Sequence, residues 1–246
     1  MTMTHTADGS GAPRDRYTRV AIALHWAIAA FILFNLATGF FMEGWPPPVR
    51  MLALMLHASS GMTVLVLTVV RVAWRLLNEP PPYPKDMKPL ERHAAHFAHF
   101  FLYAAMVLMP LTGWAILSAH APPGSAGAVA EFSAPPAMPP GMKPGMKPGG
   151  PPPGAMGARP TKPPPPLKLW NVVTMPRISA IEEIAREPAG VPAQRVLHDE
   201  FVDWHGVGGW LLVALLVLHV LGALKHQFMD KHAEFERMSF GRRKAG

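Results

Sequence analysis

Residues 211–228 read LLVALLVLHVLGALKHQF, a run of leucine and valine as apolar as a membrane span, with His219 near its middle. Fourteen residues earlier, in DWHGVGGW, stands His205. Fourteen helical residues complete almost four turns, so both imidazoles leave one face of the helix, roughly 21 Å apart along its axis. Polar groups at bilayer depth are costly and usually face the interior of a bundle. The stretch therefore predicts a membrane helix that offers an imidazole at each of two depths.

Three further segments are as apolar as this one, and together they predict the fold. A hydrocarbon core takes about 20 helical residues to cross, and the segments 20–41, 52–77, 95–118 and 207–228 are all long enough. None alternates like a barrel strand, and lipid tolerates only structures that satisfy their own backbone. We expect an all-α fold, a transmembrane four-helix bundle. The polar start, residues 1–19, has no small-residue cleavage site, so the first span is expected to be retained as an anchor.

The distribution of charge predicts the orientation. The net charge is +7, and the basic residues gather before the first span, around the second connection and in the tail, whereas the short first connection has only Arg50. By the positive-inside rule, both termini are expected to face the cytoplasm. The positive charge is thus a topology signal and does not indicate nucleic acid. The absence of cysteine excludes disulfides, thiolate-bound iron–sulfur clusters and a cysteine nucleophile.

The connection between the third and fourth spans is long and falls into two parts. Residues 119–166 are dominated by proline and glycine, which predicts a disordered, extended periplasmic insertion. Its methionines are either soft ligands for Cu(I) or part of an inert low-complexity segment, and they are Met138, Met142, Met146 and Met156. Residues 167–200 read as an ordered periplasmic loop, in which SAIEEIAR predicts a short helix capped by Ser179.

The domain organisation follows from these segments. We expect a cytoplasmic N-terminal segment, three spans, the insertion, the ordered loop, the fourth span and a basic cytoplasmic tail, with the ranges 1–19, 20–118, 119–166, 167–200, 201–228 and 229–246.

Two more histidines match the two depths on the fourth span. His25, in IALHWAI, lies near the cytoplasmic end of the first span, and His57, in LMLHASSGM, near the periplasmic end of the second. His219 is therefore expected to meet His25, and His205 to meet His57. Opposed imidazoles in a bundle core suit the axial ligation of haem, so the two pairs predict two b-type haems. A membrane histidine can also be a packing residue or a quinone contact, and zinc would require more ligands at one depth.

Five other residues are candidates for contacts with haem or quinone. Arg71 and Arg75 end the second span, where they suit haem propionates as well as the positive-inside rule. His96 and His99 are expected to face the interior of the bundle near a haem edge or a quinone head group. His226 lies seven residues after His219, and we expect it to bond a propionate or a quinone, or to sit at the interface.

The chain resembles the bacterial cytochrome b561 family. The resemblance is carried by IALHW, by LHASSGMTVLVLTVVRVAWRL, by AHFAHFFLYAAMVLMPLTGW, by NVVTMP and by WHGVGGWLLVALLVLHVLGALKHQF. It implies a di-haem membrane cytochrome with iron ligands at His25, His57, His205 and His219. Family members pass electrons between a quinone pool and a partner, and one branch oxidises superoxide while reducing ubiquinone. The Pro/Gly-rich insertion departs from the family pattern and leaves the periplasmic partner open.

Three functions are compatible with the sequence. The first is electron transfer between a periplasmic donor, a redox protein or superoxide, and ubiquinone; whether this amounts to an oxidoreductase is left open. Basic residues that could steer an anionic donor are Arg50, Lys168 and Arg177. The second is a haem-bearing anchor subunit of a larger dehydrogenase or hydrogenase. The third is a histidine-lined ion transporter, which the lack of intramembrane acids disfavours. The expected partners are lipid and ubiquinone, with the chain a monomer or homodimer.

Overall fold

The computed structural model describes residues 16–84, 87–133, 167–230 and 234–240. Two compact units are present, residues 1–113 with 203–246 and residues 114–202, and each has its own cluster of buried apolar side chains. The four methionines of the Pro/Gly-rich insertion lie outside the described residues.

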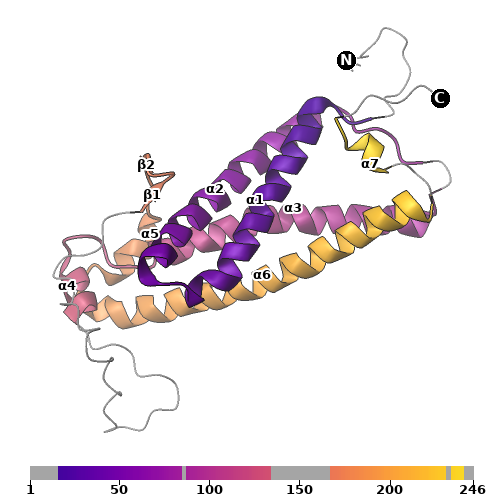
Figure 1. Ribbon diagram of the computed structural model, residues 1–246. Helices are drawn as coiled ribbons and strands as arrows, with labels where there is room; N and C mark the ends of the chain where they lie inside the picture. The colour runs from indigo at the N-terminus through magenta and orange to yellow at the C-terminus, as the bar shows by residue number, and fades with distance from the viewer. Residues whose placement is uncertain (1–15, 85–86, 134–166, 231–233, 241–246) are drawn as a thin grey trace. The chain divides into compact units, whose positions relative to one another are not determined.

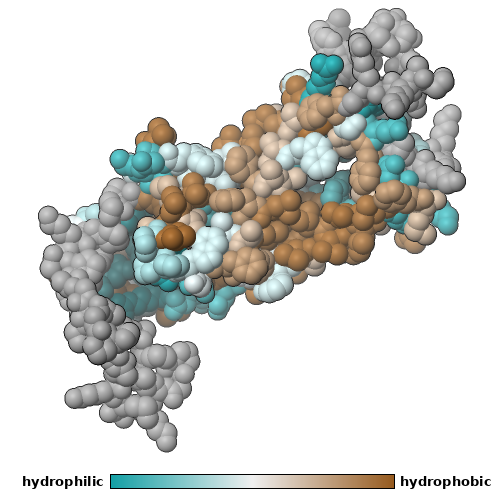
Figure 2. Space-filling model, viewed as in Figure 1, coloured by the Kyte–Doolittle hydropathy of each residue, from teal (hydrophilic) through white to brown (hydrophobic). Residues whose placement is uncertain are grey.

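Four long helices confirm the all-α, four-span prediction (Figure 1). They are α1 Arg19–Phe41, α2 Pro47–Leu77, α3 Pro89–Ser118 and α6 Val191–Phe228, and each is long and apolar enough to cross a membrane. Thr18 caps α1 by accepting the Ala21 N–H at 3.2 Å. A 3₁₀ turn, Met42–Gly44, leads to Pro47, which starts α2 at a position where its missing N–H costs nothing. Figure 2 shows the hydrophobic surface that these helices present.

All four helices begin earlier than hydropathy predicts, α1 by a single residue. The largest difference is in α6, which starts at Val191, within the stretch expected to be a loop, rather than at residue 207. Hydropathy marks only the residues that suit hydrocarbon, whereas the polar stretch VPAQRVLHDEF contains no helix breaker after Pro192 and continues the same helix outward. The insertion expected between the third and fourth spans does lie between α3 and α6.

The core of the first unit is a layer of apolar side chains from all four helices. We call this cluster the apolar layer, and it consists of Ile28, Ile32, Val64, Met106 and Leu212. On α6, the layer lies between the two candidate ligands, since Leu212 stands seven residues from both His205 and His219. Lipid-facing leucine and valine contribute little to holding the helices together, so this interdigitated layer and the polar contacts between helices supply the specificity of packing.

The second unit contains short elements. They are helix α4 Ala126–Ser133, strands β1 Lys168–Leu169 and β2 Val173–Thr174, helix α5 Ser179–Glu182 and 3₁₀ turns at Glu183–Ala185 and Pro188–Gly190. The strands pair antiparallel, with Leu169 opposite Val173, and the turn between them carries positive φ at Trp170 and Asn171.

Two expectations for this unit need correction. Helix α4 lies within the stretch expected to be extended, because its alanines favour a helix and the Ser125 hydroxyl caps it by accepting the Ala128 N–H at 3.1 Å. The short helix near residue 179 is present, but Ser179 is its first residue and not its cap. The N-cap is Ile178, with no side-chain hydrogen bond.

Two glycines allow backbone segments of the second unit to meet. A Cβ atom at Gly127 would overlap the carbonyl oxygen of Ala185, and one at Gly190 would overlap that of Ile184. We expect Gly127→Ala and Gly190→Ala each to lower the free energy of unfolding by about 1–3 kcal/mol or more, because the backbones must separate. Gly44→Ala, whose Cβ would meet nothing within 4 Å, is the control. Thermal unfolding in detergent checks this, and unchanged stability of the first two variants would contradict it.

Candidate functional site

The first unit brings the four predicted histidines together as two pairs. The ring centroids of His25 on α1 and His219 on α6 are 6.2 Å apart, and those of His57 on α2 and His205 on α6 are 6.1 Å apart. The rings are inclined by 65° and 67°, and all four residues are half-buried. The pairing is the one that the spacing on α6 predicts.

The His57–His205 pair is held by threonines that sequence analysis did not single out. Thr38 Oγ1 on α1 lies 3.0 Å from His57 Nδ1, and Thr112 Oγ1 on α3 lies 2.9 Å from His205 Nδ1. The sequence does carry a signal, since each threonine is followed by glycine, in ATGF and in LTGW, and the two Thr-Gly dipeptides lie toward the same end of the bundle.

The His25–His219 pair has different neighbours. The ring of His99 on α3 stands 5.5 Å from that of His219, and the Trp26 ring stands 5.3 Å from that of His25. His99 is half-buried, as expected for a residue facing the interior. His96, for which the same was expected, is exposed, and its ring lies 5.3 Å from that of Tyr83.

His226 and its neighbours form an ion-pair cluster at the end of α6. His226 Nδ1 lies 2.7 Å from Asp230 Oδ2, and Lys225 Nζ lies 2.6 Å from the same oxygen and 2.9 Å from Glu91 Oε1. The Lys225 ammonium, with help from His226, holds the pKa of the Asp230 carboxyl below its usual range. Because a lysine already neutralises these acids, the cluster is better described as an ion-pair network than as a metal site.

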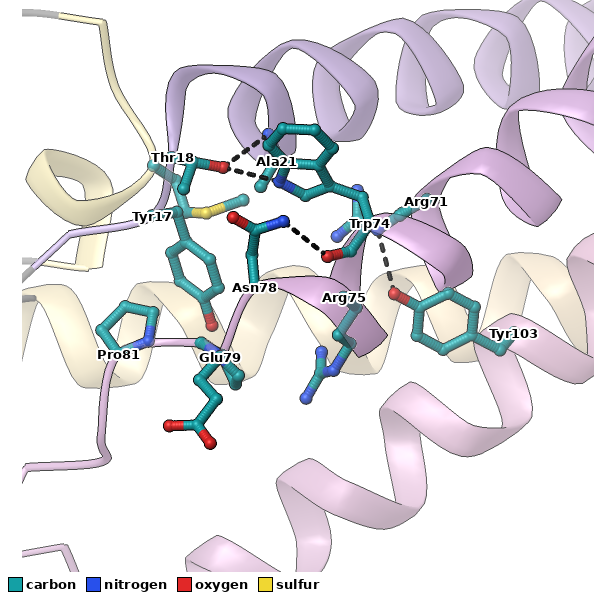
Figure 3. Close-up of a pocket in the computed structure, with 12 residues that line it drawn as sticks. Tyr17, Thr18, Ala21, Arg71, Trp74, Arg75, Asn78, Glu79, Pro81 and Tyr103 are labelled. Carbon is teal, nitrogen blue, oxygen red and sulfur yellow. Dashed lines mark hydrogen bonds between the residues drawn. The ribbon is translucent and has the colours of Figure 1, made fainter. Parts of the chain in front are cut away.

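A pocket opens where the start of α1 meets the end of α2, at the end of the bundle that carries the His25–His219 pair (Figure 3). It is partly open to the surroundings and is lined by residues at the start of α1, by the end of α2 and the residues that follow it, by Tyr103 of α3 and by Met238. Arg71 and Arg75 both line it, and Arg71 Nε donates to the Tyr103 hydroxyl at 3.0 Å. Trp74 Nε1 donates to the Thr18 hydroxyl at 2.9 Å, which ties the end of α2 to the start of α1.

Two buried polar side chains of the bundle, Ser60 and Thr68, differ in their contacts. The Asn35 amide of α1 meets the Ser60 hydroxyl of α2 at 2.6 Å, and Ser60 is fully buried. Thr68 of α2 is 2% exposed, yet its hydroxyl has no hydrogen-bond partner among the described residues. A buried hydroxyl left without a partner costs free energy. A bound group that hydrogen-bonds to the Thr68 hydroxyl would remove this cost.

The geometry of the pairs fits a group with one metal ion between two imidazoles. An ion about 2 Å from a ring nitrogen on each side places the imidazole centroids roughly 6 Å apart, close to the separations of 6.1 and 6.2 Å. Zinc favours four ligands, whereas each pair brings only two imidazoles together. Two axial imidazoles are the donor set of a haem iron in a helical bundle.

The chain is similar in sequence to several known bacterial proteins. The chain is 30% identical over 115 residues to "Cytochrome b561 homolog 2" of Escherichia coli (strain K12), covering 44% of this chain and 59% of the relative. It is 26% identical over 106 residues to "Probable superoxide oxidase CybB" of Yersinia pestis, covering 42% and 58%. It is 38% identical over 103 residues to "Cytochrome b562" of Cereibacter sphaeroides, covering 39% and 63%.

The chain thus spans about six tenths of the length of these curated relatives. The model of the family described as prokaryotic cytochrome b561 covers far more of it, residues 16–241. The chain therefore belongs to the prokaryotic cytochrome b561 family, which implies binding of haem b, and is a multi-pass bacterial membrane protein.

Proposed function

We propose that this protein carries electrons through the membrane between two b-type haems, one at each histidine pair, and exchanges them with the quinone pool. The observation that carries the proposal is the presence of two opposed histidine pairs at two depths of one bundle. Haem supplies reversible one-electron chemistry when it is bound. The residues assigned to it are His25 with His219 and His57 with His205.

The orientation and the domain boundaries belong to this proposal. Basic residues gather at the end of the bundle that carries the His25–His219 pair, so this end faces the cytoplasm, as do both termini. The His57–His205 pair is then nearer the periplasm, as are the insertion 119–166 and the segment 167–200.

The pocket at the His25–His219 end is proposed as the place where a quinone head group docks. Its lining combines the aromatic rings of Trp74 and Tyr103 with the guanidinium groups of Arg71 and Arg75, so it offers both apolar contact and hydrogen-bond donors to a carbonyl. The same arginines also suit a haem propionate. Arg71, paired with Tyr103, is assigned to the propionate, and the outer part of the pocket to the quinone.

The donor on the other side is proposed to be a small anion, with superoxide the first candidate. This rests on the similarity to the Yersinia pestis protein named a probable superoxide oxidase. Arg50 is exposed on α2, seven residues before His57, and can attract an anion to this end. Arg177 is bound within its own unit, to the Ala121 carbonyl at 3.1 Å and to Glu182 at 3.3 Å, which leaves Arg50 and Lys168 for steering.

A role as the haem-bearing anchor of a larger dehydrogenase or hydrogenase is the alternative. A large partner that co-purifies with the chain, together with failure of the purified chain to reduce a quinone by itself, would favour this alternative.

The first experiment is a haem count on the purified protein with a reduced-minus-oxidised spectrum. We expect two b-type haems per chain, falling to one in His25→Ala and in His57→Ala, because each loses an axial ligand of a different haem. His93→Ala, an exposed residue of α3, is the control and should keep both haems. Two haems retained in both ligand variants would reject the assignment, and a folded protein without haem would reject the function.

Quinone docking is tested by removing one guanidinium group from the pocket. Arg75→Gln loses a hydrogen-bond donor that lines it, so the KM for a short-chain ubiquinone should rise about two- to tenfold at unchanged haem content. Arg92→Gln makes the same change outside the residues that line the pocket and should leave the KM unchanged. Equal effects of the two substitutions in steady-state kinetics would place the quinone elsewhere.

Steering of superoxide is tested by the charge at residue 50. Arg50→Gln should lower the second-order rate constant for haem reduction by superoxide roughly threefold and weaken its dependence on ionic strength, because one attractive charge is lost. Arg19→Gln removes an exposed charge at the start of α1, at the opposite end of the bundle, and is the control. Pulse radiolysis or stopped-flow spectroscopy at several salt concentrations measures this rate constant. A rate independent of both charges would favour a protein donor.

A further inference from the structure

The two Thr-Gly dipeptides hold their histidines in the same way. Thr38 contacts His57 Nδ1, and a Cβ atom at Gly39 would lie 3.3 Å from Cε1 of the same ring. Thr112 contacts His205 Nδ1, and a Cβ atom at Gly113 would lie 3.3 Å from its Cε1. In both cases, one helix presents a hydroxyl and a bare backbone to the same edge of a ring on another helix.

Each threonine hydroxyl also lies within hydrogen-bond distance of a carbonyl oxygen of its own helix, which can only accept. Thr38 Oγ1 lies 2.9 Å from the Phe34 carbonyl oxygen, and Thr112 Oγ1 lies 2.9 Å from that of Met109. A hydroxyl has one proton to donate and two lone pairs with which to accept. With the proton given to the carbonyl, the oxygen accepts from the ring, and Nδ1 must carry the hydrogen.

This assignment fixes which ring nitrogen is free. A neutral imidazole has one protonated and one bare nitrogen, and the hydrogen bond made by one decides the role of the other. With Nδ1 protonated, Nε2 is bare and available to a metal ion. The glycines contribute by proximity, since a side chain at either position would crowd Cε1 and turn the ring.

The other pair lacks these contacts. Among the described residues, no hydrogen bond reaches a ring nitrogen of His25 or His219, and His219 instead meets the ring of His99 edge-on at 5.5 Å. The two pairs therefore have similar centroid separations but different surroundings.

We propose that Thr38-Gly39 and Thr112-Gly113 are matched positioning elements that lock His57 and His205 in the Nδ1-protonated form and tune the potential of the haem between them. This proposal rests on the proposed assignment of that pair as haem ligands. A hydrogen bond accepted from Nδ1–H makes the imidazole a more basic ligand. A more basic ligand favours the oxidised, more positively charged iron, so the two threonines lower the midpoint potential of this haem.

The test is redox potentiometry of the purified haem protein, with the haem of the His57–His205 pair identified by its loss in His57→Ala. Thr38→Val and Thr112→Val should each raise the potential of this haem alone. Loss of an outer hydrogen bond to a metal ligand typically changes an equilibrium constant by about tenfold or more, which is about 59 mV for one electron. Thr38→Ser and Thr112→Ser keep the hydroxyl and should restore the original potential.

A control variant and two contrary results distinguish failure of this proposal from failure of the proposed function. Thr63→Val removes a hydroxyl bonded to the Ser59 carbonyl and should leave both potentials unchanged. Two haems with unshifted potentials in both valine variants would overturn this proposal and leave the proposed function intact, whereas a wild-type protein without the two haems would overturn the function itself.

Loss of haem in a variant is also informative. Loss in the valine variants with retention in the serine variants supports the hydroxyl as the positioning group. Loss in both sets would show that the hydroxyl is not sufficient to hold the ring and would reject the proposal. Gly39→Ala and Gly113→Ala keep both hydroxyls and should broaden or shift the absorption of the same haem only; a change in the other haem would count against the assignment.

Discussion

Helix α6 carries two histidines fourteen residues apart, and the pitch of an α-helix turns this spacing into two rings on one face, about 21 Å apart. The other candidate ligands of the first unit lie at those two depths. Helix α1 supplies a partner at one depth and α2 at the other. Because the pitch is fixed by backbone hydrogen bonds, an insertion or deletion of one residue between His205 and His219 would turn one ring by about 100° out of the bundle.

The polar groups of the bundle show how imidazoles are tolerated at such depths. The Thr38 and Thr112 hydroxyls are bonded to helix carbonyls and to histidine rings at once. Asn35 links α1 to the buried Ser60 of α2. Hydrogen bonds of this kind join helices in a medium where burial of leucine gives no preference for protein over lipid. The same contacts that satisfy the polar groups therefore hold the helices in register.

Much of this arrangement could be predicted from the sequence, for identifiable reasons. The four spans follow from hydropathy, and the pairing of His25 with His219 and His57 with His205 follows from their depths. The extension of α6 back to Val191 was missed, because polar residues outside a membrane leave no hydropathy signal. The threonines were missed because their contacts cross between helices, and spacing along one helix does not reveal them. His96 was placed in the interior by a spacing of three residues, which drifts around a helix.

The apolar layer has an electrical consequence. Side chains from all four helices form this layer, at Ile28, Ile32, Val64, Met106 and Leu212, and apolar side chains neither donate nor accept a proton. Under the proposed assignment, an electron passing from one pair to the other therefore moves a net charge across much of the membrane's thickness without compensation. Moving one charge through the full membrane against 100 mV costs about 2.3 kcal/mol. The membrane voltage would thus shift the distribution of electrons between the two haems. Electron transfer between the two faces of the membrane would therefore depend on that voltage.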